Sequence, residues 1–107
     1  MTQHHFHLDK LTRFSIHLEE LFSALRGCRQ DELLLELADE IAVTAGEIML
    51  LLASHDDDEL VRAALADARR LRESARTLQL ERARLVEAVT ILSGDIERII
   101  REEKRAA

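Results

Sequence analysis

The sequence contains no proline, asparagine, tryptophan or tyrosine, and only three of its 107 residues are glycine. Proline, glycine and asparagine supply most tight turns, and aromatic residues are enriched in strands, so their scarcity excludes hairpin-rich sheets and barrels. Leucine, alanine, glutamate and arginine dominate the residues that are present, and all four have high helix propensity. The sequence therefore predicts an all-α protein, and its length matches a single domain covering residues 1–107.

The chain also lacks a second cysteine and any long hydrophobic run. Cys28 alone cannot form an internal disulfide, which fits a reducing compartment. The longest apolar run, residues 48–53, is far shorter than the ~20 residues of a membrane span, and the N-terminus does not have the pattern of a secretory leader. We therefore expect a cytoplasmic protein that does not bind membranes. The net charge of −6 makes nucleic acid an unlikely partner.

Two helices are predicted in the first half of the chain from apolar residues spaced three and four apart. The first covers about residues 8–27 and the second about residues 31–54. Asp31 is expected to cap the second helix. This helix is apolar around much of its circumference, and we expect it to be the most buried of the helices.

A third helix is predicted over about residues 58–104. Asp56 and Glu59 have the spacing of a capping box at its start. A heptad series of apolar residues then continues from Val61 to Ile99, interrupted only by Arg82 as a polar member, and predicts a left-handed coiled-coil seam. Residues 93–95 are a possible break, although the register continues through them.

This third helix is predicted to be twice as long as the first two, which pack as a hairpin on its first half. Its second half then keeps an apolar stripe that nothing in the chain covers, and such a patch favours self-association. We therefore expect a homodimer that completes a helical bundle, or a partner helix in the same place. The predicted interface residues are Leu78, Arg82, Leu85, Val89, Leu92, Ile96 and Ile99.

Charge is segregated along the chain. Residues 31–59 carry ten acidic residues and no lysine or arginine, whereas residues 62–84 carry seven arginines and three acidic residues. The simplest interpretation is that these two segments are antiparallel neighbours whose flanking charges pair, within or between subunits. The alternative is that the arginine-rich stretch 62–84 binds an acidic partner or RNA.

Candidate catalytic and metal-binding residues are few. His4, His5 and His7 are weak candidates for binding a transition metal, because imidazole is a ligand for zinc, copper and nickel. No catalytic residues and no cofactor site are predicted, since no nucleophile, base and orienting group share a helix face.

The sequence therefore predicts a non-enzymatic helical interaction or assembly module that acts through its long C-terminal helix. In size, acidity and an amphipathic C-terminal helix it is similar to bacterial export chaperones of the flagellar and type III secretion kind, which implies a chaperone-like or adaptor role. The alternative is a small metal-binding bundle that uses the N-terminal histidines and Cys28.

Overall fold

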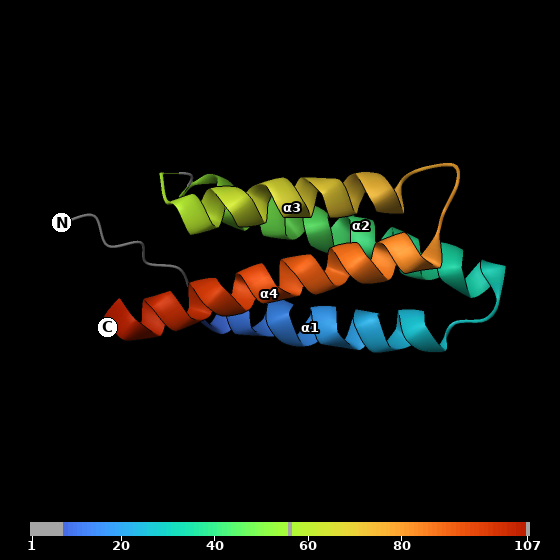
Figure 1. Cartoon of the computed structure of the whole chain (residues 1–107), viewed down its shortest axis with the longest axis horizontal. Helices are drawn as coiled ribbons and strands as arrows, with labels where there is room; N and C mark the ends of the chain where they lie inside the picture. The colour runs from blue at the N-terminus through green and yellow to red at the C-terminus, as the bar shows by residue number, and fades with distance from the viewer. Residues whose placement is uncertain (1–7, 56, 107) are drawn as a thin grey trace.

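The structure is a computed structural model that describes residues 8–55 and 57–106. These residues form four helices, α1 (Leu8–Gly27), α2 (Asp31–Ala53), α3 (Glu59–Ala75) and α4 (Arg82–Ala106). Consecutive helices are antiparallel, and α4 packs beside both α3 and α1 (Figure 1). The pair α1 and α2 makes the least extensive contact of the four neighbouring pairs. The predicted all-α class is confirmed.

The prediction of one continuous helix over residues 58–104 is wrong. The chain leaves α3 after Ala75, turns, and returns as α4 from Arg82. At the end of α3 the N–H of Arg76 donates to the carbonyl of Arg72 at 3.1 Å, and Leu78 in the turn is fully exposed. The structure therefore has four helices, and the hairpin packed on one long helix is not formed.

Burial explains why the helix ends without a proline or glycine. The turn brings five large side chains of α4 into the core, namely Leu85, Val89, Leu92, Ile96 and Ile99. Each fully buried side chain of this size contributes about 2 kcal/mol, so the five together contribute roughly 10 kcal/mol. Interrupting a helix for one turn loses a few hydrogen bonds of about 1 kcal/mol each. Folding back is therefore favoured over one extended helix.

The helix boundaries also differ from the sequence prediction in detail. The residue before α2 is Gln30, in an extended conformation and with no side-chain cap, so Asp31 lies in the first turn instead of capping it. At α3 the cap is Asp58, whose Oδ1 accepts from the N–H of Leu60 at 2.8 Å. The expected cap Asp56 lies outside the described residues. Residues 93–95 form no break, because α4 is continuous through them.

Candidate functional site on α2 and α3

The predicted interface residues do not form an exposed surface. Five of them lie in the core with at most 3% exposure, namely Leu85, Val89, Leu92, Ile96 and Ile99. Leu78 is fully exposed in the turn, and Arg82 is exposed at the start of α4, where its Nη1 donates to the carbonyl of Cys28 at 2.6 Å. The chain itself covers the stripe, and the expected apolar patch on the C-terminal helix is absent from the described residues.

The metal-binding alternative finds no site in the described part of the chain. The candidate ligands His4, His5 and His7 lie outside the described residues. Cys28 is buried, and its thiol donates to the carbonyl of Gln30 at 3.3 Å. No group of three histidine, cysteine, aspartate or glutamate side chains converges among residues 8–55 and 57–106.

Three large apolar side chains on one side of α2 are exposed. Leu35, Val43 and Leu50 are 58%, 61% and 79% exposed. Their spacing places them on one side of the helix together with Gly46, roughly opposite the buried side that includes Ile41. We call Leu35, Val43, Gly46 and Leu50 the α2 face. The expectation that this helix is the most buried is therefore wrong, because its apolar residues point both inward and outward.

Shallow grooves border the α2 face on both sides. On the α3 side a groove of about 460 Å³ has Val43, Leu50 and Leu65 in its apolar lining and Arg69 and Arg72 at its edge. On the α1 side a groove of about 590 Å³ includes Leu50 and Leu51, with Lys10 and Arg13 at its edge. Leu50 therefore forms a ridge between two grooves that each carry two basic residues and share the carboxylate of Glu47. Apolar surface bordered by charge is suited to contact with another helix.

The seven arginines of residues 62–84 do not form one surface. Arg70 pairs with Asp67 at 3.6 Å and Arg84 with Glu81 at 3.2 Å, while Arg82 bonds to the backbone as described above. Of the remaining four, Arg62 lines neither groove beside α2 and α3. The other three, at the C-terminal half and end of α3, line grooves between α2 and α3, and we call them the arginine row: Arg69, Arg72 and Arg76.

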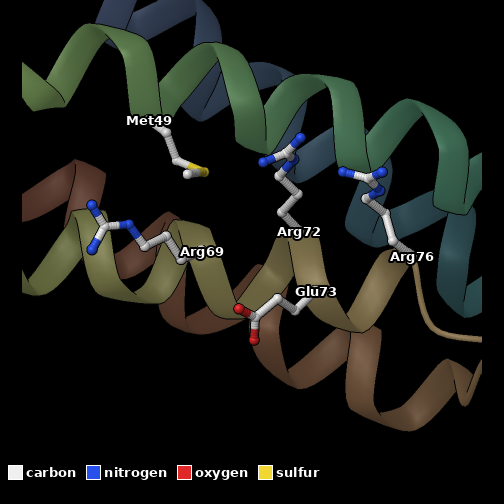
Figure 2. A pocket seen from close by; sticks show the side chains of 5 residues that line it. All are labelled: Met49, Arg69, Arg72, Glu73 and Arg76. Carbon is white, nitrogen blue, oxygen red and sulfur yellow. The ribbon is translucent and has the colours of Figure 1, made fainter.

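The arginine row borders the groove without internal partners. Arg72 and Arg76 reach from α3 toward α2, and Met49 reaches from α2 toward α3 (Figure 2). Within the described residues, no carboxylate lies within 4.0 Å of Arg69, Arg72 or Arg76. Surface arginines without a partner in their own chain are available to bind an external anion or carboxylate.

The acidic residues of α2 are also without arginine partners. Glu40 contacts His17 of α1 at 3.3 Å, but no carboxylate of α2 pairs with an arginine of α3 in the part of the chain that is described. The two helices are antiparallel neighbours as expected, yet the ion pairs expected between them are not formed among residues 31–53 and 59–75. Three exposed carboxylates lie at the Leu35 end of the α2 face, namely Glu32, Glu36 and Asp39.

A separate buried carboxyl group lies between α3 and α4. Asp95 is 7% exposed. Among the described residues, its Oδ2 has no hydrogen-bond partner except the carboxyl group of Asp67. The pKa of Asp95 is raised to about 7, first by burial and then by the hydrogen bond and negative charge of Asp67, against the opposing charge of Arg98. Without a nucleophile or third ligand beside it, this pair supports no catalytic assignment.

Sequence reasoning missed the α2 face, although the signal was present. The second helix is apolar around much of its circumference, which also describes a helix with two apolar sides. Burial inside a larger core was the simpler interpretation. A bundle of four short helices is too small to surround any one of them. The second apolar side of α2 is therefore exposed.

No helix among the described residues is both long and apolar enough to cross a bilayer. No family model, curated protein or solved structure matches this sequence.

Proposed function

We propose that this protein is a non-enzymatic helical interaction module that binds a protein helix along the α2 face. The observation that carries this proposal is the row of Leu35, Val43 and Leu50, each more than half exposed, beside an arginine row that has no carboxylate partner among the described residues. Exposed apolar side chains in a row with a charged border are typical of an interaction surface. A chaperone-like or adaptor role remains part of the proposal, with α2 in place of the C-terminal helix.

The charged residues beside the α2 face determine which kind of partner helix can bind there. A partner whose apolar stripe packs on Val43 and Leu50 places its flanking residues beside Arg69 and Arg72 on one side and beside Lys10 and Arg13 on the other. Carboxylates at these flanking positions form favourable pairs, whereas lysines are repelled. The partner is therefore an acidic amphipathic helix.

Binding of designed peptides tests the proposal. One peptide is an amphipathic helix of the length of α2 with leucines on one side and glutamates beside them, and the second carries lysine at each glutamate position. We expect fluorescence anisotropy to show binding of the acidic peptide only. Leu50→Lys should weaken this binding at least tenfold because it puts an ammonium group, which must stay hydrated, in place of the apolar end of the side chain at the centre of the contact. Ile91→Lys, a matched change of an exposed apolar residue on α4, should not.

Two results contradict the proposal. The first is failure of both peptides to bind protein that is monomeric at the concentration of the assay, and the second is binding that Leu50→Lys does not weaken. RNA is the alternative anionic partner of the arginine row. It would be favoured if a single-stranded oligonucleotide bound with a steep salt dependence while neither peptide did. The described phenylalanines, Phe14 and Phe22, lie on α1 and provide no stacking platform beside the arginine row.

A further inference from the structure

We propose that the helix bound on the α2 face is α2 of a second copy of this chain, packed antiparallel in a two-fold dimer. This inference rests on the proposed function and names its partner. It assigns a different surface from the C-terminal stripe that the sequence suggested. The contact is isologous, since each copy uses the same residues.

The apolar residues fit an antiparallel pairing of two α2 helices. Leu35 and Leu50 lie near opposite ends of α2, and Val43 lies close to its centre. When two copies run in opposite directions with Leu35 of one against Leu50 of the other, Val43 lies near the two-fold axis and close to its symmetry mate. Each exposed leucine is then covered by a leucine of the partner.

Gly46 allows the two helices to approach closely. It lies on the α2 face, and the space that a Cβ atom would occupy has no neighbouring atom within 4 Å. In the antiparallel register Gly46 lies opposite Asp39 of the second copy. The absent side chain leaves room for that carboxylate to reach the edge of the groove, where Arg69 and Arg72 lie.

The strongest support is charge complementarity along both edges of α2. Four basic residues border the Leu50 end, Arg69 and Arg72 on one side and Lys10 and Arg13 on the other, and Glu47 is the one acidic residue that lines these two grooves. The Leu35 end is acidic, because it carries Glu32, Glu36 and Asp39. An antiparallel dimer brings each acidic end against a basic end twice, whereas a parallel dimer brings like charges together.

Self-association also explains why these charges do not pair inside the chain. The acidic and basic groups lie on adjacent helices, yet the carboxylates of α2 make no contact with the arginine row in the described residues. A second copy supplies both an apolar stripe that can pack on the α2 face and flanking carboxylates that can pair with the arginine row. The same sequence therefore serves as receptor and ligand.

A charge exchange between two variants tests the pairing. The first variant is Arg69→Glu with Arg72→Glu, and the second is Glu36→Lys with Asp39→Lys. Sedimentation equilibrium should show a dimer for the wild type and at least a tenfold weaker self-association for each variant alone, because its like charges meet. An equimolar mixture should dimerise again, because the contacts of positions 69 and 72 with positions 36 and 39 are complementary at both ends of the mixed dimer.

Matched controls separate the contact from net charge and from misfolding. Arg101→Glu with Arg105→Glu on α4 changes the net charge as the first variant does, and it should leave dimerisation unchanged. Circular dichroism should show wild-type helicity for all variants, since every altered residue except the half-buried Arg72 is exposed.

Cysteine cross-linking tests the orientation. In a Cys28→Ser background, Leu35→Cys and Leu50→Cys should each fail to form a disulfide with themselves under mild oxidation. A mixture of the two variants should form the mixed disulfide, because only an antiparallel dimer brings these positions together. Self-linking of Leu50→Cys would show a parallel pair and overturn the inference.

The outcomes distinguish this inference from the proposed function. A wild type that stays monomeric while the acidic peptide binds in a Leu50-dependent way overturns the second copy as partner and leaves the interaction module supported. A dimer that neither the charge variants nor Leu50→Lys weaken uses another face, and this overturns the inference. Absence of both dimerisation and peptide binding overturns both proposals.

Discussion

The guanidinium of Arg82 donates a hydrogen bond of 2.6 Å to the main-chain carbonyl of Cys28, which lies 54 residues earlier in the sequence. This bond joins the start of α4 to the connection between α1 and α2, at the end of the bundle where the chain also turns from α3 into α4 (Figure 1). A long-range bond to a backbone carbonyl fixes the position of the returning helix. Arg82 therefore supports the fold-back itself, although its place in the heptad series suggested a polar residue in a dimer seam.

Replacing Arg82 should destabilise the bundle. Arg82→Met keeps most of the aliphatic stem and removes the donor, so we expect a loss of about 1 kcal/mol in the free energy of unfolding, reduced from the usual value because the side chain is exposed. Urea denaturation followed by circular dichroism measures this loss. Arg84→Met is the control, because its partner is the nearby Glu81, and it should cost less. Equal stability of Arg82→Met and wild type would contradict the prediction.

Stability should fall as the pH rises from about 4 to about 7. The pKa of Asp95 is raised from 3.8 to about 7 by burial, then by the hydrogen bond and charge of Asp67, with Arg98 opposing. Between these values the unfolded state loses this proton while the folded state keeps it, so unfolding becomes more favourable with increasing pH. The loss reaches at most about 4 kcal/mol above pH 7 and is absent below pH 4.

Asp95→Asn removes this dependence while keeping the size of the side chain and a donor toward Asp67. We expect the variant to be more stable than wild type by about 1–3 kcal/mol at pH 8 and equal to it near pH 4. Thermal unfolding at several pH values measures the difference. Glu97→Asn on the exposed side of α4 is the control and should show no such crossover. A stability gain that is the same at pH 4 and pH 8 would show that ionisation of Asp95 is not its cause.

Two aspartate substitutions should separate core from surface. Val89→Asp introduces a charge into the fully buried interior and should cost at least 3 kcal/mol, enough to unfold much of the protein. Val43→Asp, the same change on the α2 face, should leave the helix content unchanged and lower the melting temperature only by what the proposed dimer contributes, so that the two proteins melt alike at low concentration. Circular dichroism measures both. If Val89→Asp gave a folded monomer, this position would belong to a separable interface and not to the core.

Spin labels can measure the fold-back directly. Cysteines at Ala63 and Glu97, both exposed, carry the labels in a Cys28→Ser background. In one continuous helix these positions are about 51 Å apart, whereas in adjacent antiparallel helices the labels lie within about 25 Å. Pulsed electron paramagnetic resonance on a sample diluted with unlabelled protein should give the short distance. A dominant long distance would show an open chain.

The sequence was sufficient to predict the first two helices to within one residue, and it placed Leu85, Val89, Leu92, Ile96 and Ile99 on one apolar side of a helix. Both results depend on local properties, namely helix propensity and the periodicity of apolar residues. The same periodicity does not indicate whether the chain itself or a partner covers an apolar side of a helix. A stripe buried by its own chain and a stripe buried by a partner have the same spacing.

What the sequence alone determined is therefore the all-α class and the inward side of each helix. The tertiary structure decided that the chain turns between Ala75 and Arg82, because burial of the α4 side chains outweighs the local preference to continue a helix. It also decided which apolar residues remain outside. With α4 returned to the core, the uncovered side belongs to α2, and Leu35, Val43 and Leu50 are left on the surface beside the arginines of α3.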